Sequence, residues 1–144
     1  MKNDLTAKAA VTIDSSPNDV WKALTDPKKI KQYMFDADVM SDWEIGGPIR
    51  WKGLYNGKRY EDKGVIRKFE PHRLLQFTHF SPLSGKADVP ENYHNVTIEL
   101  AGQGEKTRVT VTQDNNDNEN ARAHSEQNWE TVLNGLKSVV EQSS

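Results

Sequence analysis

The stretch ENARAHSEQNWETVLNGLKSVVEQ, residues 119–142, decides the fold of this chain. Its apolar residues recur at the spacing of one face of an α-helix. The stripe consists of Trp129, Val132, Leu133, Leu136, Val139 and Val140. This is the longest helix that the sequence predicts. An apolar helical face must be buried against another layer of structure, so the rest of the chain has to supply a partner for it.

Strands are predicted for most of the chain between this helix and the N-terminus. Residues 5–14 alternate apolar and polar side chains, as a half-buried strand does. Later segments with strand character cover 36–43, 49–55, 58–69, 74–80, 93–100 and 107–113. Asn56-Gly57 is the strongest short signal for a β-hairpin. About six to seven strands joined by short turns predict an antiparallel sheet.

Two short helices are expected directly after the first strand. Ser16 can cap the first, Pro17 suits its first position, and Asp19 adds a carboxylate to its first turn. Pro27 ends this helix and opens a second short one. These helices are too short to cover a sheet, and we expect them to close one of its ends.

The predicted fold is therefore α+β, with a curved antiparallel sheet wrapped around the long C-terminal helix. Its 144 residues are expected to form one domain, residues 1–144. A strongly bent sheet around one helix rarely fills its centre, so a cavity between sheet and helix is expected. One register stays open: Leu74 and Leu75 are both apolar, and a shift by one residue would exchange His79 and Phe80 in that cavity.

Composition excludes several classes of function. The chain has no cysteine, which removes disulfides and thiolate chemistry, and a net charge of −2 with scattered basic residues does not favour a nucleic-acid binder. No apolar run approaches the roughly 20 residues of a membrane span, and the N-terminus lacks the apolar core of a signal peptide. We expect a cytoplasmic protein, while its oligomeric state stays undetermined.

Several motifs along the chain resemble one known superfamily. They are SPNDVWKALTDP at 16–27, WEIGGPIRW at 43–51, GVIRKFEPHRL at 64–74 and TRVTVTQ at 107–113, followed by Trp129. Together they resemble the SRPBCC (START-like) superfamily, in the branch named for activators of the heat-shock chaperone ATPase. The resemblance implies a helix-grip fold with a pocket between sheet and long helix. Relatives include lipid carriers, hormone binders, cyclase-like proteins and chaperone activators, so the family indicates fold much better than function.

One set of residues is predicted to line the cavity, because its members lie on inward strand faces or on the N-terminal extension of the helical stripe. It comprises Trp51, Tyr55, Phe77, His79, Gln113, Arg122, Ser125 and Trp129. An apolar pocket with a few convergent polar groups is typical of small-ligand sites. The aromatic residues of the set could equally fill the core, and this is the interpretation we favour for Trp129.

Catalytic and metal sites have weaker support. The four histidines form no short-spaced ligand pair, although His79 and His94 could face each other across a hairpin, so neither metal nor cofactor is expected. Ser81, Asp88 and His94 can be written as a triad, but nothing places Ser81 on a strained elbow, and hydrogen bonds that cap the loop explain these residues better. No catalytic residue is therefore predicted.

Three functions remain open. The preferred one is non-catalytic binding of a small hydrophobic or aromatic molecule in the cavity. The first alternative is an interaction module that modulates a chaperone or another protein partner. The second is a cyclase- or hydrolase-like enzyme in which His79 or Asp62 moves a proton, although the sequence shows no acid–base pair at convincing spacing.

Overall fold

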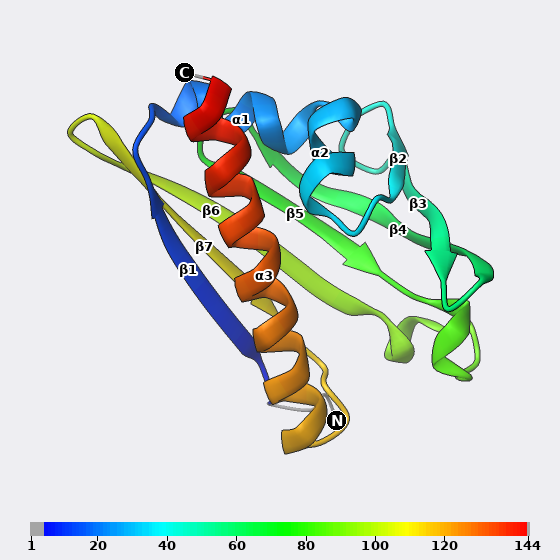
Figure 1. Ribbon diagram of the computed structural model, residues 1–144. Coiled ribbons are helices and arrows are strands. Elements are labelled where there is room, and N and C mark those ends of the chain that lie inside the picture. The colour runs from blue at the N-terminus through cyan, green and yellow to red at the C-terminus, as the bar shows by residue number, and fades with distance from the viewer. Residues whose placement is uncertain (1–4, 144) are drawn as a thin grey trace.

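The computed structural model describes residues 5–143, apart from the side chains of Tyr55 and Ser143. In this part of the chain, seven strands form one antiparallel sheet in the order β1-β7-β6-β5-β4-β3-β2. Their bounds are β1 Ala7–Ile13, β2 Asp38–Ser41, β3 Pro48–Tyr55, β4 Lys58–Glu70, β5 Leu74–His79, β6 His94–Gln103 and β7 Lys106–Gln113. The sheet is strongly curved (Figure 1), and it confirms the predicted α+β helix-grip fold.

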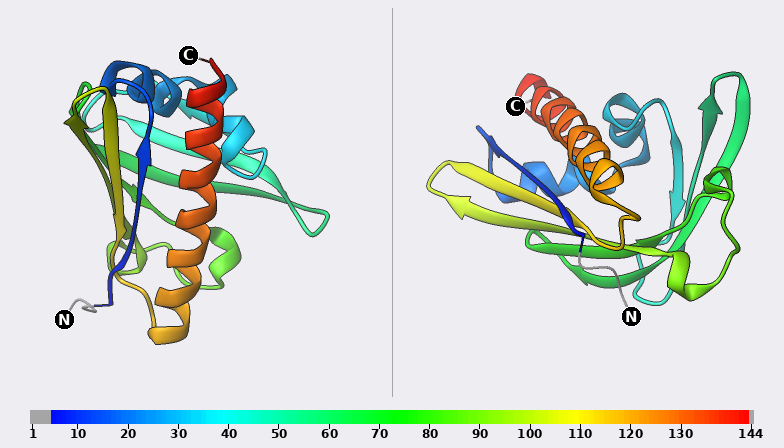
Figure 2. Two further views of the ribbon diagram at one scale, coloured as in Figure 1. Left: turned by 60° about the vertical axis from the view of Figure 1, so that its left-hand side comes forward. Right: turned by 90° about the horizontal axis from the view of Figure 1, so that it is seen from below.

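The long helix α3, Glu119–Ser143, crosses the concave face of this sheet. The view from below in Figure 2 shows the strands curving around it. Four residues of its predicted stripe, Val132, Leu133, Leu136 and Val140, are buried, and Trp129 and Val139 are partly buried. Together with β1 and β7 these residues form the central apolar core. No helix in residues 5–143 is long and apolar enough to cross a membrane.

The short helices α1, Pro17–Thr25, and α2, Pro27–Tyr33, begin as the sequence predicts. The hydroxyl of Ser16 accepts a hydrogen bond from the backbone N–H of Asp19 at 3.2 Å, which caps α1. Tyr33 joins the helices, because its hydroxyl donates to the carbonyl of Ala23 at 2.8 Å while Gly135 of α3 packs closely against it. A larger residue at Gly135 would push α2 away from α3. The C-terminal end of α2 is thereby fixed over the sheet.

The β3–β4 hairpin turns at Asn56-Gly57, where both residues have positive φ, 51° and 79°. This is the backbone of the two-residue turn that the dipeptide predicts. The turn fixes the register, so Trp51 pairs with Asp62 across the two strands. Further along β4, the pairing with β5 is irregular between Ile66 and Lys68.

Strand β5 settles the register that the sequence left open. Leu75 and Phe77 are buried on the face toward α3, and His79 follows them at the same alternation. Phe80 lies on the opposite register and stacks on Tyr93, with ring centroids 5.1 Å apart. The structure therefore has the register in which His79, and not Phe80, lines the cavity.

Most bounds lie within a few residues of expectation, and two segments differ in character. Strand β2 is only four residues long, whereas residues 36–43 were predicted, because Asp36 and Trp43 both have positive φ and cannot continue an extended strand. The connection at 81–92 contains two short 3₁₀ turns, Pro82–Ser84 and Pro90–Asn92, rather than irregular loop throughout. In both segments the local turn preferences of the residues determine the backbone conformation.

Candidate functional site

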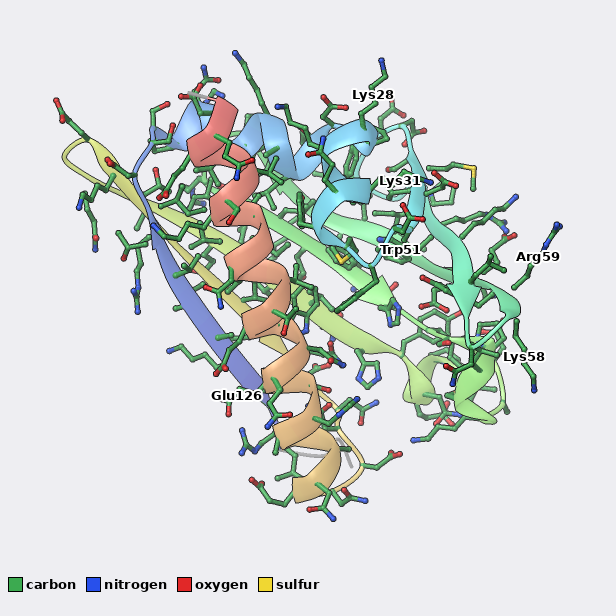
Figure 3. The ribbon with its side chains drawn as sticks, viewed as in Figure 1. Lys28, Lys31, Trp51, Lys58, Arg59 and Glu126 are labelled. Carbon is green, nitrogen blue, oxygen red and sulfur yellow. The ribbon has the colours of Figure 1, made fainter. Side chains whose placement is uncertain are left out.

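A cavity of about 280 Å³ lies between the sheet, the end of α2 and α3. Its volume is close to the lower end of the range for small-molecule sites. The sheet contributes Trp51, Tyr60, Asp62, Phe77, His79, Val96 and Gln113. The helical side consists of Met34, Phe35, Ser125, Asn128, Trp129 and Val132. In Figure 3, Trp51 lies beside the end of α2, while Lys58 and Arg59 extend away from the molecule at the hairpin tip.

Aromatic side chains form the main wall of this cavity. Trp51 and Phe77 are 7% and 4% exposed, and their rings lie 5.2 Å apart between centroids. They come from strands β3 and β5 on the concave face. Trp129 faces them from α3 and is only partly buried. Aromatic rings from both layers thus line the cavity, as is typical of apolar ligand sites.

A hydrogen-bonded group connects the sheet to α3 at one side of the cavity. The indole N–H of Trp129 donates to Oε1 of Gln113 at 2.7 Å. The amide of Gln113 in turn lies 3.4 Å from the hydroxyl of Ser125, and that hydroxyl donates to Asn116 at 2.9 Å. Asn116 is 2% exposed and bonds to the backbone of Gln113. These mutual bonds hold the Trp129 ring in one orientation.

An acid–base pair lies at another part of the wall, contrary to the expectation that none has suitable spacing. Nε2 of His79 is 2.9 Å from Oδ2 of Asp62. The side chains of the two residues are only 28% and 15% exposed. The other carboxylate oxygen, Oδ1, is buried and is the one buried side-chain oxygen or nitrogen of residues 5–143 without a hydrogen bond. A buried carboxylate oxygen left unpaired is costly, and such groups are frequent at functional sites.

The cavity brings together six of the eight side chains that the sequence singled out. They are Trp51, Phe77, His79, Gln113, Ser125 and Trp129. The side chain of Tyr55 lies outside the described residues. Arg122 does not line the cavity, because its guanidinium pairs with Glu119 and Glu126 on its own helix. Both partners belong to the exposed first turns of α3.

Other lining residues were absent from the predicted set. Met34 and Phe35 follow α2, and Phe35 is 59% exposed with a left-handed backbone, φ 51°. No pattern in the sequence signals such a position. Asp62 was within reach of sequence reasoning, because a two-residue turn at Asn56-Gly57 places it directly opposite Trp51. Tyr60 lines the cavity as well, and burial together with the nearby Asp62 raises the pKa of its phenol.

The residues of the hypothetical Ser81 triad do not assemble. The hydroxyl of Ser81 accepts a hydrogen bond from the backbone of Leu83. Asp88 pairs with Lys63, and Nδ1 of His94 lies 2.8 Å from the carbonyl of Asp114. The loop-capping interpretation is confirmed for Ser81. Within residues 5–143, no cluster of three or more acidic, histidine or cysteine side chains could hold a metal ion.

His94 pairs with His79 across β5 and β6, and their rings stack with centroids 6.2 Å apart. Burial is the largest influence on His94 and lowers its pKa below the ordinary 6.5, although the Asp114 carbonyl opposes this. The folded state therefore binds this proton less readily than the unfolded chain does. Stability contributed by neutral His94 is present above about pH 6.5 and is lost as the pH falls through that value toward the folded pKa.

We expect the unfolding free energy to decrease between about pH 7.5 and 5.5, and His94→Gln to flatten this dependence. Urea unfolding across that range measures it. The matched control is His124→Gln, because His124 is exposed on α3. An equal pH slope in the His94→Gln variant and the unmodified protein would contradict the assignment.

The curved sheet, its covering helix and the cavity between them define a protein of the SRPBCC, helix-grip class. Comparison with protein families identifies the branch. The family described as "Activator of Hsp90 ATPase homolog 1-like protein" matches residues 14–141. The chain belongs to this family. A search among curated proteins returned no significant match.

Solved structures of similar proteins support the fold. ChR145 from Cytophaga hutchinsonii is 48% identical, with a TM-score of 0.85 over 99% of this chain and 98% of that one. The Aha1 dimer from Colwellia psychrerythraea is 22% identical, with a TM-score of 0.74 over 94% and 96% of the two chains. CalU16 from Micromonospora echinospora is 21% identical, with a TM-score of 0.72 over 94% and 75%. The last two likenesses concern the fold alone.

Proposed function

We propose that this protein binds a small hydrophobic or aromatic molecule in the cavity between the sheet and α3, without converting it to a product. The observation that carries the proposal is the cavity of about 280 Å³ with Trp51, Phe77 and Trp129 in its wall. Aromatic walls stabilise aromatic ligands through offset and edge-to-face contacts in addition to burial of apolar area. The ligand would thus replace water that can make few hydrogen bonds along these walls.

The size of the cavity limits the ligand. The cavity volume of about 280 Å³ lies just below the roughly 300–1,000 Å³ of typical small-molecule sites. A molecule with a single ring, or with two fused rings, fits this space better than a long lipid chain. The few polar groups on the wall, mainly Gln113, Ser125 and the Asp62–His79 pair, would orient it.

Two alternatives carry less support. Modulation of a chaperone or another protein partner rests on family membership alone. An enzyme of the cyclase or hydrolase type would use the Asp62–His79 pair, which lies at hydrogen-bond distance. The aromatic side chains that line the cavity support binding most directly, and we therefore prefer binding to both alternatives.

The test compares two Phe→Leu variants with the unmodified protein. Phe77 lines the cavity, whereas Phe69 packs against Trp21 with ring centroids 5.2 Å apart and does not line it. We expect 2-naphthol or 2-methoxynaphthalene to raise the melting temperature in proportion to the logarithm of its concentration. Phe77→Leu should weaken binding by roughly tenfold, because it removes ring contacts worth ~1.4 kcal/mol. Phe69→Leu should bind as the unmodified protein does.

Mass spectrometry of protein purified from cells and then denatured gives an independent readout, as it reveals a native ligand released from the cavity. A melting temperature that neither probe changes, with no released molecule, would contradict the proposed function. The same holds for equal probe affinities in Phe77→Leu and Phe69→Leu.

A further inference from the structure

The Asp62–His79 contact defines which nitrogen of the imidazole carries a proton. Nε2 of His79 lies 2.9 Å from Oδ2 of Asp62. An ionised carboxylate only accepts hydrogen bonds, so Nε2–H is the donor in either charge state of the ring. In the neutral ring, Nδ1 is then the unprotonated nitrogen. Asp62 thereby sets the tautomer of His79, as the carboxylate does in acid–base pairs of enzymes.

Nδ1 of His79 has no hydrogen-bond partner among residues 5–143, although His79 lines the cavity. Nor does the indole N–H of Trp51, a residue that is 7% exposed and whose ring lies 5.1 Å from that of His79. Neither of these two nitrogens is fully buried, so each has some solvent-accessible surface. Two residues of the wall therefore carry an imidazole nitrogen and an indole N–H that no described residue satisfies.

The carboxylate itself is shielded from a ligand on one side. Oδ1 of Asp62 is fully buried, and Oδ2 already accepts from His79. A ligand can thus reach the carboxylate only at Oδ2, the oxygen that already accepts from His79. The negative charge of Asp62 disfavours an anionic ligand group in this part of the cavity.

We propose that Asp62 and His79 form a proton-accepting pair, and that the cavity takes aromatic compounds with an ionisable hydroxyl group that hydrogen-bonds to Nδ1 of His79. This inference rests on the proposed function and names the ligand class for the same cavity. His79 is the residue that touches the ligand, and Asp62 is a positioning residue. The arrangement has the parts of an Asp–His–Ser triad with the two ring nitrogens exchanged, because Asp62 bonds Nε2 and leaves Nδ1 for the ligand hydroxyl.

A hydroxyl suits both charge states of this pair. With neutral His79 the ligand O–H donates to Nδ1. If the proton moves, the ligand O–H bond breaks and an Nδ1–H bond forms, which leaves a phenolate paired with an imidazolium, and the net charge of the site is unchanged. A methyl ether has no such proton and can only accept. The neighbouring His94 is a weaker base than an ordinary histidine, because burial lowers its pKa.

The experiment measures the affinities of 2-naphthol and 2-methoxynaphthalene by calorimetry at one pH in four proteins. The ratio of the two affinities is the readout, because a merely structural change would weaken both probes alike. The unmodified protein should prefer 2-naphthol by roughly tenfold, the value of one hydrogen bond to such a pair. His79→Phe should abolish the preference while it keeps an aromatic ring, and Asp62→Asn should reduce it. Phe77→Leu, the control, should weaken both probes and keep the ratio.

The outcomes separate the two proposals. If both probes bind the unmodified protein equally well, or if the preference survives in His79→Phe, the proton-accepting pair is refuted while the binding function stands. If neither probe binds, the inferred ligand class is refuted, and the binding function fails as well if mass spectrometry finds no released molecule. Should His79→Phe not fold, as judged by circular dichroism, Asp62→Asn decides: an unchanged ratio in that variant refutes the pair.

Discussion

Gly64→Ala is expected to lower the free energy of unfolding by about 3 kcal/mol or more, which is at the upper end for overpacking. Gly64 lies in β4, and a Cβ at this position would be 1.7 Å from the carbonyl oxygen of Thr78 and 2.6 Å from its carbonyl carbon. Both are backbone atoms of β5, so no side-chain rotation relieves the clash. The neighbouring bond from the N–H of Val65 to the Thr78 hydroxyl, 2.9 Å, would be strained too.

This substitution also tests how the site is supported, since Thr78 directly precedes His79. The control is Gly102→Ala in β6, where the added Cβ would meet only a side-chain carbon of Pro17 at 3.6 Å, an ordinary contact. Urea unfolding of the two variants gives the comparison. Gly102→Ala should stay within about 1 kcal/mol of the unmodified protein. Equal unfolding midpoints for the two variants would show that β4 and β5 are not packed as described.

Leu136→Ala is expected to cost about 2–5 kcal/mol of unfolding free energy, the range for a leucine truncated in a core. Leu136 is 0% exposed on the face of α3 that packs on the sheet. The truncation would leave a void between the two layers, and a rigid sheet cannot close over it fully.

The control for this prediction is Leu54→Ala. Leu54 is 67% exposed on β3, so its truncation should change the unfolding free energy by no more than about 0.5 kcal/mol. Both variants are measured by urea unfolding with the same probe. A loss in Leu136→Ala as small as that in Leu54→Ala would mean that α3 does not hold the sheet through its apolar stripe.

The fold was predictable because its signals are local and periodic. The stripe from Trp129 to Val140 requires a buried helix, and Asn56-Gly57 requires a tight hairpin. Ser16 and Pro17 locate the start of α1 to the residue. The structure confirms each of these features, since little beyond local geometry enters them.

The candidate site was only partly predictable, because it depends on how distant segments meet. The hairpin turn places Asp62 opposite Trp51, but His79 reaches Asp62 only through the β4–β5 pairing, which is irregular between Ile66 and Lys68. Such an irregularity is invisible in the alternation pattern. Helical spacing alone put Arg122 on the same stripe as Trp129, although acidic neighbours on α3 pair with its guanidinium.

The central claim is that a small aromatic molecule binds between the sheet and α3, and the four tryptophans of the chain test it directly. Trp51 and Trp129 line the cavity, whereas Trp21 and Trp43 pack around Phe69, with ring centroids 5.2 Å and 6.4 Å from it. We would follow the four indole N–H signals by ¹H–¹⁵N NMR while 2-methoxynaphthalene is added. The account predicts saturable shifts for Trp51 and Trp129 and nearly unchanged signals for Trp21 and Trp43. Shifts confined to Trp21 and Trp43, or no saturable shift at all, would contradict it.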